Sequence, residues 1–249
     1  MNSVEEKKEK MTVIYISPPF GNYVSYKDCI RVRGTFTWKR RPGIIKQCIK
    51  TIRPVRGGWR NAIGFRNPGL SNVEIKKSDT YSIAALDSNW DIFLQQMPYS
   101  HPSFIELNIG CPNVNKYDIS DKEISAFVKC VEEGYVKGLS VKLSPVNCHR
   151  EYIKRLHDLG IRRFHLSNAV PTPEGGISGY SLKKINLTNV ENAARLNLKD
   201  VEIIAGGGVY KPQDVRDYRN VGANSFSLAT IWFTPWKVPA VYKEISFLS

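Results

Sequence analysis

A thiol stands between two carboxamides in the segment Ile105–Asn113, which reads Ile-Glu-Leu-Asn-Ile-Gly-Cys-Pro-Asn. Pro112 lacks a backbone donor and fixes its own φ, so the apolar strand must end there and Cys111 falls at a strand-to-loop junction. A thiol near Asn108 and Asn113 could exchange a proton with a bound ring that carries amide groups. This segment alone leaves one alternative open, a buried cysteine beside a turn-forming Pro-Asn pair.

Two other segments could bind an anion. Lys142 interrupts the apolar run Val141–Leu143, and an ammonium in a buried strand needs an anionic group to receive it. The alternative is a lysine that extends outward beneath a helix. Gly206–Gly208 follow another apolar run, where backbone N–H groups could converge on a phosphate or simply form a tight turn. Ala229–Thr230 offer a further N–H and a hydroxyl after the last run.

Eight short apolar runs in the sequence predict the β-strands that must position these groups. They span residues 13–16, 30–37, 81–85, 104–108, 139–143, 163–167, 201–205 and 225–230. Helices are predicted between most of them, most clearly at 121–133, 151–159 and 212–218. Ser120 and Glu123 have the spacing of a capping box at the start of the first of these helices.

Alternation of strands and helices implies parallel strands with right-handed crossovers, and eight strands imply closure. We therefore expect an α/β fold, a single-domain (β/α)8 TIM barrel over residues 12–249. The charged segment 1–11 is expected to be a disordered tail, because it lacks the apolar centre of a secretory signal. Two prolines between Ser17 and Cys29 discourage a helix, so the first unit should be irregular.

Length and composition exclude several classes of protein. The chain has 249 residues, 42% of them hydrophobic, and no apolar run that could cross a bilayer. We expect a soluble, cytoplasmic protein with no membrane partner. The five cysteines are odd in number and contain no Cys-x-x-Cys pair, which argues against a disulfide framework or a metal centre. Cys48 and Cys130 lie in apolar helical stretches and are expected in the core.

A formal charge of +13 and a pI near 9.5 favour an anionic substrate or partner, or a nucleic-acid surface. The basic residues do not form one block. They cluster at Lys39–Arg41, Arg53–Arg66, Arg162–Arg163 and Lys183–Lys184, and each cluster is interpreted as a solvated face.

Seven short segments, in order along most of the chain, carry a family resemblance. They are Gly34–Thr37 with Arg41–Gly43, Asn61–Gly69, Asn108–Asn113, Val141–Pro145, Ser167–Asn168, Gly175–Gly179 and Gly207–Gly208. On these segments the chain resembles the dihydroorotate dehydrogenase family. The resemblance implies a barrel that holds FMN and oxidises dihydroorotate, or a related dihydropyrimidine, to orotate with hydride transfer to flavin N5. It implies that Cys111 accepts the proton, as in the cysteine-using class of the family.

Residue by residue, the resemblance assigns a pyrimidine site and a flavin site, with Cys111 as the catalytic residue and no metal. The implied substrate contacts are Asn61, Ile63, Gly64, Phe65, Asn108, Asn113 and Asn168. The implied cofactor contacts are Ser17, Gly34, Thr35, Asn108, Lys142, Ser167, Gly176, Gly207, Gly208, Ala229 and Thr230. Carboxamides suit the edge of a pyrimidine because they supply donors and acceptors without charge.

Two other functions stay open at this stage. The segment Asn108–Pro112 is also similar to the tRNA-dihydrouridine synthases, in which the cysteine protonates a uracil ring, although no separate C-terminal helical domain is evident. The other is a flavin-binding barrel without turnover. We expect a small-molecule pyrimidine substrate as the main partner; a homodimer is compatible with the sequence, and nucleic acid is not favoured.

Overall fold

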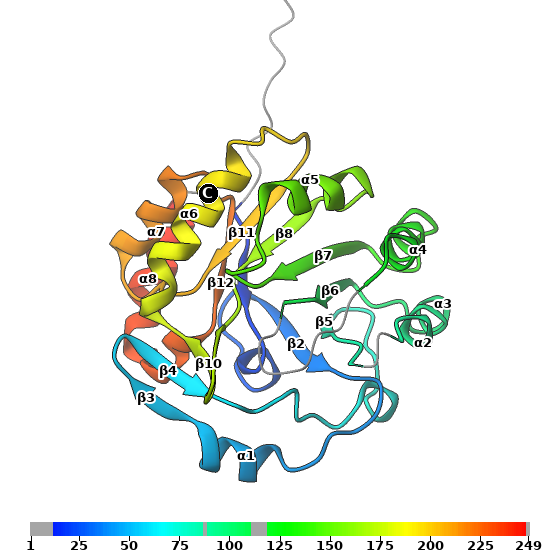
Figure 1. The fold of residues 1–249 in the computed structure, drawn as a ribbon, viewed down its shortest axis with the longest axis horizontal. Helices are drawn as coiled ribbons and strands as arrows, with labels where there is room; N and C mark the ends of the chain where they lie inside the picture. The colour runs from blue at the N-terminus through cyan, green and yellow to red at the C-terminus, as the bar shows by residue number, and fades with distance from the viewer. Residues whose placement is uncertain (1–11, 87–88, 111–118, 248–249) are drawn as a thin grey trace, which may run out of the picture.

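The fold is a closed barrel of eight parallel strands, seen in a computed structural model that describes residues 12–86, 89–110 and 119–247 (Figure 1). The barrel strands are β1 (Ile14–Ile16), β2 (Ile30–Phe36), β5 (Thr80–Ile83), β6 (Phe104–Asn108), β7 (Gly138–Leu143), β8 (Arg163–Leu166), β11 (Glu202–Gly206) and β12 (Ser225–Leu228). β1 closes the barrel against β12, with Ile14 opposite Phe226. The (β/α)8 barrel predicted from the sequence is confirmed, and each predicted strand overlaps one of these eight.

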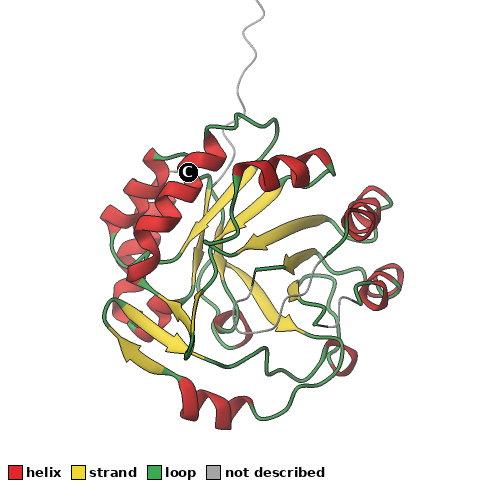
Figure 2. Cartoon of the chain, viewed as in Figure 1, coloured by secondary structure: helices red, strands yellow, loops and turns green. Residues whose placement is uncertain are grey.

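Helices cover the outside of the barrel (Figure 2). They are α1 (Ile44–Thr51), α2 (Asp91–Leu94), α3 (Met97–Ser100), α4 (Asp121–Glu132), α5 (Arg150–Asp158), α6 (Lys183–Ala194), α7 (Pro212–Asn220) and α8 (Val238–Phe247). The predicted capping box of α4 is confirmed, because Ser120 Oγ accepts from the Glu123 N–H and the Glu123 carboxylate accepts from the Ser120 N–H. No described helix has the length and apolar character needed to cross a bilayer.

Short 3-10 turns complete the fold. They are η1 (Phe20–Asn22), η2 (Leu70–Asn72), η3 (Tyr180–Leu182), η4 (Thr230–Phe233) and η5 (Pro235–Lys237). Only η1 lies between β1 and β2, so the irregular first unit is confirmed. The predicted tail 1–11 lies outside the described residues.

A second sheet, absent from the sequence prediction, lies beside the barrel. It is antiparallel in the order β3-β4-β10-β9, with β3 at Arg53–Val55, β4 at Gly58–Asn61, β9 at Val170–Thr172 and β10 at Gly175–Ser178. The insertion after β2 supplies two of its strands and the loop after β8 supplies the other two. Figure 1 shows this sheet next to α1, on the side of the barrel away from α4 and α5.

The barrel interior is polar, and the apolar core lies between strands and helices. Near the amino ends of the strands, Glu202 accepts from Arg163 Nε at 2.6 Å, from Ser225 at 2.6 Å and from Tyr15 at 3.1 Å. Alternate residues of the same strands point outward and pack under the helices. A polar interior leaves charged side chains facing any group bound at the top of the barrel.

Candidate active site

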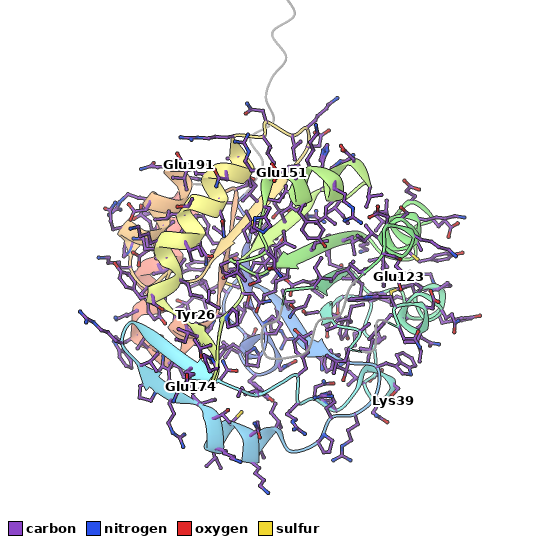
Figure 3. All side chains as sticks on the ribbon, in the orientation of Figure 1. Tyr26, Lys39, Glu123, Glu151, Glu174 and Glu191 are labelled. Carbon is purple, nitrogen blue, oxygen red and sulfur yellow. The ribbon has the colours of Figure 1, made fainter. Side chains whose placement is uncertain are left out.

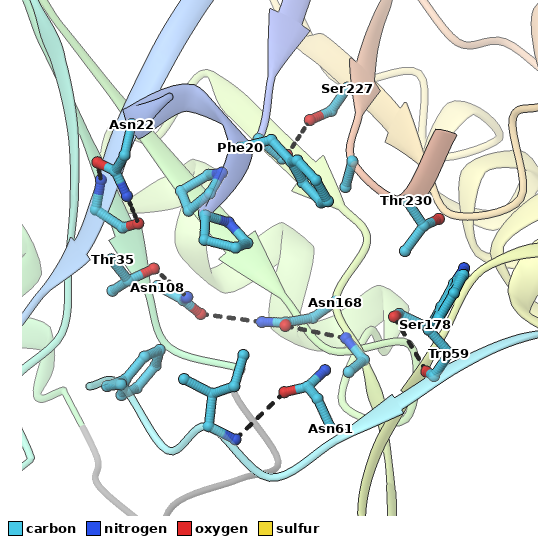
Figure 4. Close-up of a pocket in the computed structure, with 18 of the residues that line it drawn as sticks. Phe20, Asn22, Thr35, Trp59, Asn61, Asn108, Asn168, Ser178, Ser227 and Thr230 are labelled. Carbon is cyan, nitrogen blue, oxygen red and sulfur yellow. Dashed lines mark hydrogen bonds between the residues drawn. The ribbon is translucent and has the colours of Figure 1, made fainter. Parts of the chain in front are cut away.

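A cavity of about 720 Å³ opens at the carboxyl ends of the barrel strands. This end of a (β/α)8 barrel is where substrates and cofactors usually bind, and the volume is within the ordinary range for a small-molecule site. Loops after β1, β8, β11 and β12 form one side of the cavity, and α1, β4 and the loop after β4 form the other. Figure 4 shows polar side chains from both sides pointing into it.

Most of the predicted site residues come together in this one cavity. Its wall includes Ser17, Gly34, Thr35, Asn61, Ile63, Gly64, Phe65, Asn108, Lys142, Ser167, Asn168, Gly207, Gly208, Ala229 and Thr230. Gly176 is not part of the wall, because it is held inside the second sheet between Asn61 and Pro171. Cys111 and Asn113 lie outside the described residues.

A row of neutral polar side chains crosses the floor of the cavity (Figure 4). Asn108 donates through Nδ2 to Thr35 Oγ1 at 2.9 Å, and its Oδ1 accepts from Asn168 Nδ2 at 2.9 Å. Asn168 Oδ1 in turn accepts from the Ala169 N–H at 3.0 Å. These bonds fix the orientation of both carboxamides before any ligand arrives. Asn61 faces the row from β4, as Figure 4 shows.

Three ionisable side chains lie on adjacent strands next to this row. Lys142 in β7 is paired in register with His165 in β8, and Glu106 in β6 lies two residues before Asn108. All three are buried, with exposed fractions of 7%, 3% and 3% respectively. Glu106 Oε2 accepts from His165 Nδ1 at 2.7 Å. Lys142 and His165 also line the cavity, so the network reaches the binding site.

The protonation states of this network follow from burial and charge. Burial alone would raise the pKa of Glu106, but attraction to Lys142 and then to His165 outweighs it and lowers the pKa to about 2. Burial, together with repulsion from Lys142, lowers the pKa of His165 more than Glu106 raises it. At neutral pH we therefore expect an ionised Glu106 and a neutral His165 that donates its Nδ1–H. The ammonium of Lys142 has no ion-pair partner within 4 Å among the described residues.

Glycines and hydroxyls after β11, β12 and β1 shape the opposite end of the cavity. Gly207 and Gly208 have φ of 77° and 81°, a conformation that side chains other than hydrogen adopt only with strain. Ser17 and Ser227 share a hydrogen bond at the ends of β1 and β12, and Thr230 follows close by (Figure 4). Backbone N–H groups and hydroxyls of this kind suit the oxygens of a phosphate.

The mouth of the cavity is apolar. Phe233 packs on Phe20 and on Trp59, with ring centroids 5.1 and 4.3 Å apart. On the far side, Cys48 and its helix α1 line the opening. The prediction that Cys48 belongs to the core is therefore wrong, because α1 contains no fully buried residue, whereas Cys130 is buried as predicted.

Sequence reasoning assigned no site role to His165 and did not consider Glu106. A signal was present, because Glu106 and Asn108 are two residues apart in one strand and must share the interior face. The aromatic residues at the mouth carried no comparable signal, since Trp59 reaches the cavity only through the unpredicted second sheet.

Comparison with known proteins identifies the relatives of this chain. The family model described as dihydroorotate dehydrogenase matches residues 30–248. The catalytic subunit of dihydroorotate dehydrogenase B (NAD(+)) from Staphylococcus carnosus is 31% identical, and the match covers 76% of this chain and 70% of that protein. The subunit of the same name from Shouchella clausii is 26% identical, covering 78% of this chain and 73% of that protein.

Solved structures show the same fold. DHODH from Eimeria tenella, in complex with ferulenol, superposes with a TM-score of 0.70 at 16% identity, over 93% of this chain and 80% of that chain. The ligand-free form from the same organism gives a TM-score of 0.63 at 17% identity, over 86% of this chain and 75% of that chain. As its segments predicted, the chain belongs to the dihydroorotate dehydrogenase family, oxidoreductases that act on CH–CH bonds.

Proposed function

We propose that this protein binds FMN and oxidises dihydroorotate, or a close dihydropyrimidine relative, to orotate. The observation that carries the proposal is the fixed row Thr35–Asn108–Asn168, with the buried ammonium of Lys142 in the same cavity. Neutral amides match the edge of a pyrimidine ring. A cation with no carboxylate within 4 Å in the part of the chain that the structure describes suits a ring system that gains negative charge on reduction.

The residues present fit a flavin mononucleotide. Gly207, Gly208, Ala229 and Thr230 would hold the phosphate at the ends of β11 and β12, where barrels of this type usually bind phosphate. A Cβ at Gly208 would lie 2.8 Å from the Lys183 Cβ, so the loop backbone has no room for a larger residue. When bound, FMN supplies a two-electron acceptor that takes hydride at N5.

Side chains of the protein would orient the substrate and accept its proton. Asn108 and Asn168, together with Asn61 and Asn113, would orient the pyrimidine ring between the two walls of the cavity. Cys111 follows β6 by three residues and would accept the proton from the carbon next to the one that gives up hydride. A thiol with an ordinary pKa near ~8.5 needs only a modest shift to serve as this base.

Steady-state turnover tests the proposal. FMN-loaded protein should form orotate from dihydroorotate with an artificial electron acceptor, and Asn168→Ala should lower kcat/KM by roughly 10- to 100-fold because it removes an orienting amide. Asn220→Ala, at the exposed end of α7 and outside the lining of the cavity, is the matched control and should leave kcat/KM unchanged. If wild-type protein retains FMN but forms no orotate, dihydroorotate is rejected as the substrate, whereas the proposal that the protein binds FMN is retained.

A further inference from the structure

The excess positive charge of the protein is concentrated in one part of the chain. From Cys29 to Val73 there are eleven Lys and Arg residues and no Asp or Glu. In two basic clusters elsewhere one of the two cations is paired, since Arg163 pairs with Glu202 at 2.6 Å and Lys183 pairs with two aspartates at 2.5 and 2.6 Å. The basic residues are therefore less evenly distributed along the chain than their description as separate clusters suggests.

Seven of these cations lie on α1 or within a few residues of its ends. They are Lys39, Arg40, Arg41, Lys46, Lys50, Arg53 and Arg56. All but Arg41 are exposed, and none of the seven pairs with a carboxylate among the described residues. Figure 3 shows Lys39 at the outer edge of the molecule, whereas Glu123, Glu151 and Glu191 lie over the helices elsewhere. The fourth labelled acid, Glu174, lies at the second sheet and pairs with Arg60.

Two isoleucines of α1 point into solvent among these cations. Ile45 and Ile49 are 74% and 73% exposed. The helix is anchored on its other side, where Gln47 Nε2 donates to the Ala62 carbonyl at 2.8 Å and Thr51 Oγ1 accepts from the Ala62 N–H at 3.1 Å. This anchoring holds both isoleucines outward. We call these two residues and the seven cations the α1 face.

The α1 face continues into the mouth of the cavity. Ile45 and Ile49 line the opening together with Tyr23 and Phe233, which are 73% and 37% exposed. An apolar rim of this kind, bordered by cations, is typical of a surface that binds another protein or a membrane.

We propose that the α1 face docks on an anionic lipid bilayer, with Ile45 and Ile49 at the boundary of headgroups and acyl chains and the cations over lipid phosphates. A helix with exposed apolar residues flanked by Lys and Arg binds bilayers in this way. Docking of this kind needs no spanning helix, and the proposal departs from the sequence-based expectation of no membrane partner. It is independent of the flavin chemistry proposed above.

Other occupants fit the face less well. A two-fold contact with a second copy would place this all-positive surface against itself, which like-charge repulsion opposes. Nucleic acid is also a poor match, because the isoleucines at the centre of the α1 face neither stack on bases nor form hydrogen bonds with them.

Co-sedimentation of the whole 249-residue chain with vesicles tests the proposal. Binding should occur to phosphatidylcholine mixed with phosphatidylglycerol, not to phosphatidylcholine alone, and should weaken as salt rises. Ile45→Asn/Ile49→Asn should lower the partition constant at least about 10-fold. Lys46→Gln/Lys50→Gln should lower it roughly 30-fold. Lys154→Gln/Lys184→Gln removes the same charge from exposed positions on α5 and α6 and should change it less than about twofold.

Three results would overturn the proposal. The first is no binding to the mixed vesicles. The second is equal binding by wild type and Ile45→Asn/Ile49→Asn, or an equal loss of binding in Lys46→Gln/Lys50→Gln and Lys154→Gln/Lys184→Gln. Either result would mean that the net charge of the protein alone attracts it to the vesicles. The third is a stable dimer, detected by light scattering, that the isoleucine substitutions dissociate. This result would mean that the α1 face binds a second copy of the chain. Circular dichroism matching wild type would establish that each variant is folded.

Discussion

Replacing Glu106 by Gln should destabilise the protein, because it removes a buried negative charge while keeping the size of the side chain. Glu106 is 3% exposed, and its pKa is lowered to about 2 from an ordinary 4.5. At neutral pH this shift corresponds to at most roughly 3 kcal/mol of stabilisation, because the part that comes from a charged His165 is absent while His165 is neutral. The variant also leaves the ammonium of Lys142 buried without compensation, so we expect a loss of about 3–5 kcal/mol in the free energy of unfolding.

Urea unfolding at several pH values, with and without added FMN, measures this loss. A carboxylate whose folded pKa is lowered contributes stability above its unfolded pKa and loses it as pH falls through the folded pKa. The difference between wild type and Glu106→Gln should thus be full at pH 7 and should shrink as the pH falls from 4.5 towards 2. Glu191→Gln, which breaks an exposed pair with Arg195, is the control and should cost less than about 1 kcal/mol.

A double-mutant cycle assigns the effect to the pair of charges. Lys142→Met alone and Glu106→Gln alone each leave one buried charge, whereas the double variant leaves none. The double variant should be more stable than the sum of the single losses predicts, by about 1–3 kcal/mol. Strict additivity, or a Glu106→Gln loss that stays constant from pH 7 to about pH 2, would refute the charge network.

Two further predictions concern the proposed cofactor loop and the proposed base. Gly207→Ala should weaken FMN binding and lower the free energy of unfolding by about 1–3 kcal/mol, because φ is 77° and the new Cβ would lie 2.3 Å from Asn186 Nδ2. Gly134→Ala is the control, since φ is 76° there and the space around it is open. In the same urea titration it measures the cost of the backbone conformation alone. Cys111→Ala should retain FMN fluorescence quenching and slow flavin reduction by dihydroorotate at least about 100-fold in anaerobic stopped flow; an unchanged rate would exclude the thiol as base.

The barrel was predictable because each of its strands is a short apolar run with a helix or loop after it. The second sheet was not. Its strands Arg53–Val55 and Val170–Thr172 are three residues long and each contains a proline, so neither has a local strand signal. They form because β4 and β10, far apart in the sequence, pair across the barrel top. Pairing between distant segments cannot be inferred from local patterns.

The site was predictable where a polar residue ends a strand, as Asn108 does, or closely follows one, as Asn168 does, since barrel strands present their carboxyl ends to one cavity. The Glu106–His165 pair had only a partial signal, the shared face of Glu106 and Asn108, because its contact depends on the pairing of β6 and β8 on either side of β7. The α1 face escaped sequence analysis for the same reason. Cys48 and the isoleucines form an apolar helical stripe that usually faces a core, and only the fold places this stripe at a cavity mouth.

Anaerobic titration of the FMN-loaded protein with dihydroorotate tests the central claim most directly. Each equivalent of dihydroorotate should bleach the visible flavin bands of one bound FMN and yield one orotate, with Cys111→Ala bleaching far more slowly under the same conditions. Flavin bands that persist in excess dihydroorotate would contradict the claim that this cavity joins the two molecules in one reaction.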